Sequence, residues 1–203
     1  DAFANDKWGR NFLGTPPQGR ADYAFLQHII ASMDSKSGRC AILFPHGVLF
    51  RKEEKEMREA LIKSDKIEAV IGLGANLFYN SPMEACILIC NNNKSANRKG
   101  KVLMINALKE VTRKNAESYL EQNHIETILQ SYNRENEPDR ISRLVELSEI
   151  EANSFDLSLQ KYVFISDISS KLEKTSDEIN RHWSGVHNNV KGLYSTLLNM
   201  LEQ

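Results

Sequence analysis

Hydrophobic and polar residues follow two periodicities along most of the chain, one typical of helices and the other of buried strands. Apolar residues spaced by three and four predict helices over residues 21–34 and 52–64. Continuous apolar runs predict strands at residues 40–44, 67–73 and 84–90, with 102–107 as a candidate fourth strand. The first strand ends at Pro45, and its unbroken apolar run predicts burial on both faces.

The order helix, strand, helix, strand is typical of an α/β protein with a parallel, doubly wound sheet. The segment between residues 67–73 and 84–90 has about ten residues and no helical pattern. A parallel crossover needs a dozen or more residues. We therefore expect the strand at 84–90 to run antiparallel to the strand at 67–73.

The pattern is weaker further along the chain. It predicts a helix over residues 117–132, a short strand or turn at 145–150, and extended backbone over 154–163. The charge also changes, because residues 94–114 hold seven basic residues and one acidic residue. This basic stretch is either a solvated hairpin edge, protected from aggregation by its charge, or a set of contacts to DNA phosphates. The candidate phosphate contacts are Lys94, Arg98, Lys99 and Lys101.

Residues 165–203 have a different pattern, in which apolar residues recur at helical spacing. We expect a helical tail, separate from a first domain at residues 1–164. Its apolar stripe is a candidate subunit interface, formed by Ile168, Leu172, Ile179, Val186, Val190, Leu193 and Leu197. The alternative is that the tail folds back on the first domain and bends at Gly185 and Gly192.

Composition narrows the function classes. The chain has 203 residues, a formal net charge of −1 and 41% hydrophobic residues, as in an ordinary globular protein. Its three cysteines form no CxxC pair, and no His has ligand spacing, so no metal site is expected. No run is long and apolar enough to cross a membrane, and no signal peptide is recognisable, so we expect a cytoplasmic protein.

Two loops are candidates for binding chemistry. Asn76-Leu77-Phe78-Tyr79-Asn80 is an aromatic loop that follows a predicted strand. Its aromatic rings could stack on a base, or Phe78 could cap the core. His46 also follows a strand, where ligand sites gather in open α/β sheets, although a structural or capping role is the alternative.

Two other motifs are weaker. Gly72-Leu73-Gly74 lacks the third glycine of a dinucleotide loop, because position 77 is leucine, and is best interpreted as a strand-exit turn. Thr15-Pro16-Pro17-Gln18 differs at both ends from the Asn-Pro-Pro-aromatic loop of amino-group methyltransferases. We interpret it as an ordinary loop, so no catalytic residue is expected in this chain.

Several stretches together resemble the modification subunit, an adenine methyltransferase, of type I restriction-modification systems. They are Trp8-Gly9, Gly14-Thr15-Pro16-Pro17, Ala21-Asp22-Tyr23-Ala24-Phe25-Leu26-Gln27-His28, Pro45-His46-Gly47-Val48-Leu49-Phe50-Arg51, Ala69-Val70-Ile71-Gly72-Leu73, Asn76-Leu77-Phe78-Tyr79, Phe155-Asp156-Leu157-Ser158-Leu159 and Lys161-Tyr162-Val163. Their order and spacing are specific, and they run from Trp8 to Val163, over most of the chain.

The resemblance implies the second half of a Rossmann-like, S-adenosylmethionine-dependent sheet that ends in an antiparallel strand pair. In this family the cofactor loop and the Asn-Pro-Pro-Phe loop precede the matched segments, so no cofactor is expected on this chain alone. The parent reaction would methylate the exocyclic amine of adenine in DNA, after the base is flipped out. The resemblance then makes Asn76, Phe78, Tyr79 and His46 candidates for a target-base pocket.

The resemblance also implies partners: DNA, a specificity subunit and a restriction subunit of a prokaryotic system. The alternative function is an interaction module without chemistry, which binds a specificity subunit or a second copy of itself through the helical tail. The sequence upstream of Asp1 in the parent gene would distinguish the two.

Overall fold

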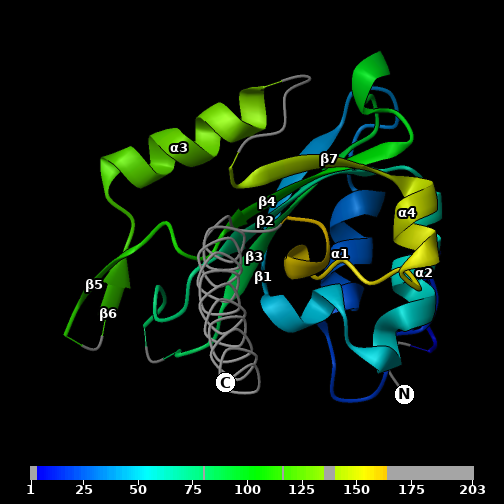
Figure 1. Ribbon diagram of the computed structural model, residues 1–203. Helices are drawn as coiled ribbons and strands as arrows, with labels where there is room; N and C mark the ends of the chain where they lie inside the picture. The colour runs from blue at the N-terminus through cyan, green and yellow to red at the C-terminus, as the bar shows by residue number, and fades with distance from the viewer. Residues whose placement is uncertain (1–3, 80, 116, 135–139, 164–203) are drawn as a thin grey trace, which may run out of the picture. The chain divides into compact units, whose positions relative to one another are not determined.

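The computed structural model describes residues 4–79, 81–115, 117–134 and 140–163, all within one unit of the chain. The predicted helical tail, with all seven of its interface residues, lies outside the described residues. A five-stranded sheet forms the centre of the unit, in the order β1-β3-β2-β4-β7 (Figure 1). Its strands are β1 (Arg39–Pro45), β2 (Ile67–Leu73), β3 (Ala85–Asn91), β4 (Lys101–Ala107) and β7 (Ser142–Glu146).

Helices cover both faces of this sheet (Figure 1). They are α1 (Asp22–Ala31), α2 (Lys55–Lys63), α3 (Gln122–Asn133) and α4 (Leu147–Ala152). Short 3-10 turns are η1 (His46–Leu49), η2 (Lys52–Glu54), η3 (Ala96–Arg98) and η4 (Leu159–Lys161), and a separate hairpin pairs β5 (Thr112–Lys114) with β6 (Glu117–Tyr119). The three predicted strands and the candidate fourth strand are all present, as are the first two predicted helices.

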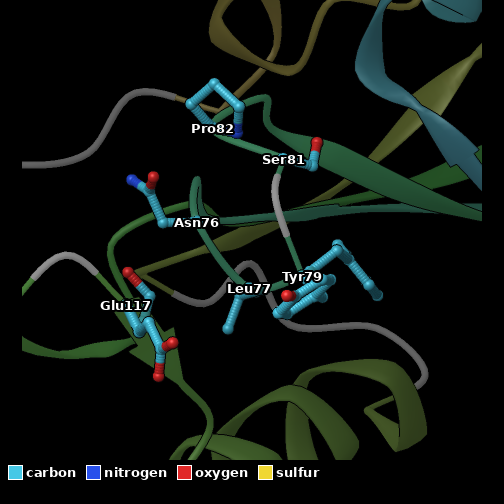
Figure 2. Close-up of a pocket in the computed structure, with 8 residues that line it drawn as sticks. Asn76, Leu77, Tyr79, Ser81, Pro82 and Glu117 are labelled. Atoms are coloured by element: carbon cyan, nitrogen blue, oxygen red, sulfur yellow. The ribbon is translucent and has the colours of Figure 1, made fainter.

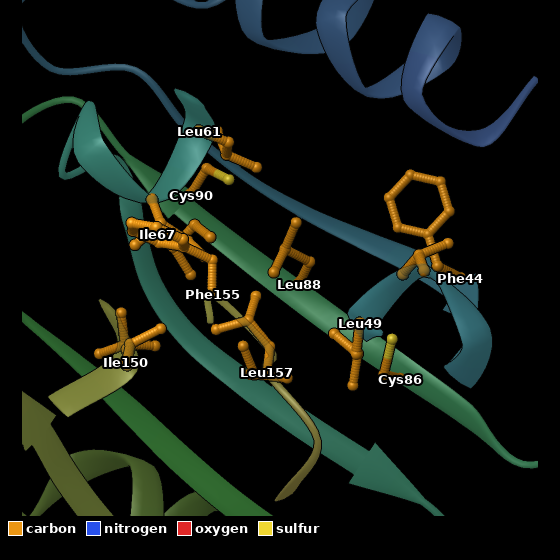
Figure 3. Close-up of a cluster of buried hydrophobic side chains, with 14 of the residues drawn as sticks. Phe44, Leu49, Leu61, Ile67, Cys86, Leu88, Cys90, Ile150, Phe155 and Leu157 are labelled. Atoms are coloured by element: carbon orange, nitrogen blue, oxygen red, sulfur yellow. The ribbon is translucent and has the colours of Figure 1, made fainter. Parts of the chain in front are cut away.

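The alternation of side chains along the strands sends apolar groups to both faces and creates two cores. The larger core packs Leu26 of α1 and Leu61 of α2 against Val70 and Leu88 of the sheet (Figure 3 shows part of it). The smaller core, on the other face, joins Ile128 of α3 to strands β2 and β4. Every residue of β2 is buried, as its continuous apolar run predicts.

The direction of the strands is the main correction to the predicted fold. Strand β3 runs antiparallel to β2, as the short connection predicts. It also runs antiparallel to β1 and lies between the two, while β4 is antiparallel to β7. Only β2 and β4 pair in parallel among the described strands. The sheet is therefore mixed and mostly antiparallel, because β3 returns directly beside β2 instead of crossing over.

Strand β1 is also less buried than predicted. It is an edge strand with one neighbour among the described strands, and its residues alternate between exposed and partly buried positions. Leu43 remains 49% exposed. A strand buried on both faces and an apolar edge strand have the same sequence pattern, so the pattern alone could not distinguish them.

The last third of the unit departs most from prediction. Helix α3 begins at Gln122, and the start of the predicted helix is strand β6 instead. Residues 145–150 contain the end of β7 and most of α4 rather than a single short strand or turn. Residues 154–163 form no strand, because Ser154 and Phe155 both have positive φ, which breaks extended backbone.

This irregular segment still completes the larger core. Phe155, Leu157 and Leu159 are all at least nine-tenths buried. Leu159 occupies the space above Gly72 of β2, where an added Cβ would lie 2.2 Å from Leu159 Cδ1. A glycine within β2 therefore allows the segment to pack directly on the sheet.

Candidate target-base pocket

The strands that run in one direction, β1, β2 and β4, end at the same edge of the sheet. A pocket of about 510 Å3 lies beyond this edge, between the loop that joins β2 to β3 and strand β6 (Figure 2). Its lining residues are Asn76, Leu77, Phe78, Tyr79, Ser81, Pro82, Glu117 and Ser118. Three of the four predicted pocket residues, Asn76, Phe78 and Tyr79, are therefore brought together.

The β2–β3 loop is held by its own backbone and by the hairpin. Asn76 has a φ of 60°, a left-handed conformation that asparagine tolerates better than most residues. Its carbonyl accepts a hydrogen bond from the backbone N–H of Ser118, at 2.9 Å. Ser81 N–H donates to the carbonyl of Phe78 at 3.0 Å, which closes the loop. These bonds present Phe78 and Tyr79 at the surface, 38% and 92% exposed.

The second wall of the pocket comes from the β5–β6 hairpin, which the sequence analysis missed. The hairpin contributes Glu117 and Ser118 from β6. A signal for it was present, because Thr112 and Tyr119 flank a turn at Asn115, which has a φ of 58°. The helical spacing after Glu117 obscured this signal.

His46 lies at the same edge of the sheet but does not line the pocket. Its predecessor Pro45 and Leu73, at the end of β2, both pair with Ala85 of β3. Pro45 and Leu73 therefore lie about two strand spacings apart, roughly 10 Å, with β3 between them. The prediction that His46 belongs to the base pocket is not supported by this geometry.

The imidazole of His46 instead occupies a buried site beside β3. Its Nδ1 lies 3.1 Å from Oε2 of Glu84, and its ring meets Phe50 edge-on at 5.8 Å between centroids. Nε2 is buried and makes no hydrogen bond to the described residues. Burial lowers the pKa of His46, although the carboxylates of Glu84 and Asp156 act to raise it. A mainly neutral imidazole fits the structural role weighed in the sequence analysis.

The four candidate phosphate contacts lie near the start of β4, at the edge of the sheet away from the pocket. Lys94 is buried, and its ammonium donates to Asp65 Oδ1 at 2.5 Å and to the carbonyls of Ile67 and Lys101 at 3.0 and 2.6 Å. These three bonds use all three protons of the ammonium. Lys94 is therefore a structural residue and not available to a phosphate.

Arg98 is also buried, and it donates from Nη2 to the carbonyls of Tyr132 and Arg134, near the end of α3. Lys101 pairs with Glu146 at 3.0 Å across β4 and β7. Only Lys99 of the four is exposed with no ion pair among the described residues. The basic run thus serves mainly to join the sheet to its own loops.

The glycine-rich turn at the end of β2 does not fit a nucleotide cofactor. A Cβ at Gly74 would lie 2.7 Å from the carbonyl oxygen of Leu108 and 2.8 Å from Val111 Cγ1. Leu159 fills the corresponding space at Gly72. Protein atoms therefore pack closely against both glycines, which explains why neither position carries a side chain. The interpretation as a strand-exit turn is confirmed.

The described residues contain neither a metal-binding cluster nor a membrane-spanning helix. No three His, Cys, Asp or Glu side chains in this part of the chain converge as ligands for a metal ion. In the same ranges, no helix has the length and hydrophobicity that a membrane crossing requires.

Two solved structures are similar to this fold. The methyltransferase subunit of a type I restriction-modification system from Streptococcus thermophilus superposes with a TM-score of 0.71 at 34% identity, over 80% of this chain and 34% of that one. The M protein of the type I enzyme EcoKI superposes with a TM-score of 0.58 at 15% identity, which shows a shared fold. The likeness at 34% identity thus indicates a domain of the methyltransferase class.

The sequence comparison specifies the family. The profile of the N-6 DNA methylase family matches residues 1–171, and the chain belongs to this family. It is 33% identical to the methylase subunit of the type I restriction enzyme MjaVIII from Methanocaldococcus jannaschii, over 98% of this chain. It is 39% identical over 110 residues to the HindI methylase subunit of Haemophilus influenzae. The chain spans about a third of the first relative and a quarter of the second.

Proposed function

We propose that this chain is part of a type I modification subunit that methylates the exocyclic amine of adenine in DNA, and that it forms one side of the target-base pocket. The observation that carries the proposal is the pocket at the carboxyl edge of the sheet. The exposed aromatic rings of Phe78 and Tyr79 line this pocket together with Asn76. An adenine flipped out of a duplex needs such a platform, because it loses its stacking neighbours and its base-pairing partner.

The edge strand supports a place within a longer Rossmann-like sheet. One side of β1 has no strand partner among the described residues, and β1 carries an exposed Leu43. Exposed apolar edges are normally covered or paired in folded proteins. The first relative is about three times as long as this chain. We propose that the remaining part of the parent protein adds a strand beside β1 and supplies the catalytic loop.

S-adenosylmethionine is the methyl donor that this function requires, and we assign its binding to the parent outside the described residues. The glycine turn of β2 is filled by protein atoms, and η1, which follows β1, is too short to offer a helical anion site. The part of the chain described by the structure therefore orients the base and excludes water from it. We propose that the cofactor is held by the remaining part of the parent protein.

The test uses the full parent subunit with its specificity subunit. Its DNA carries 2-aminopurine, a base that fluoresces when unstacked, in place of the target adenine. The fluorescence of the bound probe should change when Phe78 or Tyr79 is changed to alanine, because the flipped base loses the ring that stacks on it, about 1–3 kcal/mol. Methyl transfer to ordinary DNA should fall in parallel. Phe25→Ala is the matched control, because Phe25 is exposed on α1, away from the pocket.

Unchanged fluorescence, methylation and DNA affinity in both pocket variants would reject the proposal. That outcome would assign Phe78 to the core, which was the alternative considered for this residue. A loss in Phe25→Ala equal to that in the pocket variants would also count against it, because a general loss of folding would then explain the data.

The proposed partners are the specificity and restriction subunits of the same system, in addition to DNA. We propose that residues 165–203 form the helical docking segment for the specificity subunit. In the parent subunit, Ile179→Asp combined with Val186→Asp should abolish co-purification with the specificity subunit, because both positions lie on the apolar stripe. Lys174→Asp, off the stripe, should leave it intact. Normal co-purification of the double variant would place the docking surface elsewhere.

A further inference from the structure

We propose that Arg113, on the β5–β6 hairpin, binds a DNA phosphate beside the flipped base at the rim of the pocket. This inference rests on the proposed function and adds a residue that the sequence analysis did not select. The basic run at residues 94–114 is divided by β4, which is about 20 Å long. Its first four basic residues lie before or at the start of β4, whereas Arg113 follows the end of β4, on the pocket side.

The register of the hairpin places Arg113 next to the pocket. Arg113 pairs directly with Ser118, and register partners project from the same face of a two-stranded ribbon with Cβ atoms about 5 Å apart. Ser118 is buried, lines the pocket and donates its N–H to Asn76. Arg113 is exposed. Its long side chain therefore starts one residue spacing from the pocket wall and extends into solvent.

The charges around the pocket favour a phosphate at the rim rather than inside it. Glu117 is the one acidic residue among the described residues that line the pocket, and its carboxylate disfavours an anion inside. A flipped base is neutral and can enter, but the phosphates on either side of its sugar must remain outside. A cation at the rim therefore faces the DNA backbone when the base is inside.

Arg113 is the hairpin cation best suited to this contact. Lys114 pairs in register with the acidic Glu117, which lies on the same face of the ribbon. Arg113 faces the neutral Ser118 and forms no ion pair within the described ranges. The nearest acidic residue before it, Glu110, is already paired with Arg140 at 2.7 Å. An arginine also offers two parallel N–H donors to a phosphate, which a lysine cannot.

The experiment measures the salt dependence of DNA binding by the parent complex, with a duplex that carries the sequence methylated by the wild type. Each phosphate contact adds about 0.9 to the slope of log affinity against log salt. Arg113→Gln should lower this slope by about 0.9. The ratio of wild-type to variant affinity should therefore fall about 3.5-fold over a fourfold rise in salt. Arg113→Lys should recover the slope, and Lys114→Gln, the matched control, should change it less.

An unchanged slope in Arg113→Gln would overturn the inference. An equal change of slope in Lys114→Gln would also overturn it, because the general positive charge of the hairpin and not a specific contact would then explain the result. Arg113 is exposed, so the thermal unfolding of Arg113→Gln should match the wild type and exclude misfolding as the cause. The 2-aminopurine signal of Phe78→Ala separates the two proposals. If Arg113→Gln lowers the slope and Phe78→Ala still flips the base, the hairpin contact stands and the stacking platform fails.

Discussion

Replacing Lys94 with methionine tests whether this lysine stabilises the fold or binds DNA. Methionine keeps most of the apolar stem and removes the ammonium group. In the folded chain that ammonium joins three segments: Asp65 in the turn before β2, the carbonyl of Ile67 at the start of β2, and the carbonyl of Lys101 at the start of β4. The side chain of Lys94 is only 2% exposed.

The expected loss follows from these contacts. Breaking a fully buried ion pair costs about 3–5 kcal/mol, but Asp65 is 32% exposed and can be hydrated when its partner is removed. It also keeps the hydrogen bond from the Gly100 N–H. The two carbonyls lose a charged donor, at about 1–3 kcal/mol for each acceptor left buried. Removing a buried charge offsets part of this loss. We expect a net loss of about 2–3 kcal/mol.

Urea unfolding of the chain, followed by circular dichroism, measures this change, and a thermal scan should show the midpoint lowered by about 5–10 °C. Lys99→Met is the matched control, because Lys99 is exposed and should change stability by less than about 0.5 kcal/mol. A loss below about 1 kcal/mol in Lys94→Met, with weaker DNA binding by the parent complex, would refute the reasoning. It would restore Lys94 as a phosphate contact.

Three other changes probe the packing around the sheet. Burial holds the pKa of His46 in the folded chain below its usual 6.5, so the unfolded chain binds this proton at a higher pH than the folded chain does. Stability should therefore fall as the pH drops below 6.5, and His46→Gln should flatten that part of a plot of urea midpoint against pH. A hydrogen bond from Cys90, the partner of Cys40 on β3, lowers the pKa of Cys40 to about 7, whereas burial raises the pKa of Cys86 to about 12. Mass spectrometry should therefore find Cys40 alkylated by iodoacetamide before Cys86. Gly72→Ala should lose about 1–3 kcal/mol in urea unfolding, and combining it with Leu159→Ala should cost less than the two single losses added together.

The sequence was informative where a single physical constraint decides the outcome. The connection predicted between residues 67–73 and 84–90 has about ten residues, too few for a crossover, so the antiparallel pairing could be deduced from length alone. The aromatic loop could also be identified, because Phe78 and Tyr79 stand outside any helical or strand periodicity. Their place at the carboxyl edge then follows from the strand that precedes them.

The order of strands could not be deduced, because it depends on contacts between distant segments. The apolar run of β1 is compatible with a central or an edge position, and only the insertion of β3 beside it decides between them. Lys94 and Arg113 show the same limit for the site. Both are basic residues in one polar stretch, but one ammonium is enclosed by carbonyls and the other cation is exposed at the pocket. The charge of a residue can be read from the sequence, but the groups that surround that residue in the folded chain cannot.

The insertion of β3 between β1 and β2 also has a consequence for the order in which the chain folds. The β2–β3 hairpin closes a short loop, from Leu73 to Ala85, whereas β1 reaches its partner only through the pairing of Pro45 with the same Ala85. The longer closure costs about 1 kcal/mol more in chain entropy. During synthesis, β1 emerges before β2 and β3, and among the described strands it has no partner until β3 has followed it. Strand β1 therefore waits for β3 before it can dock in this sheet, and in the interval its apolar side chains are open to other nascent chains.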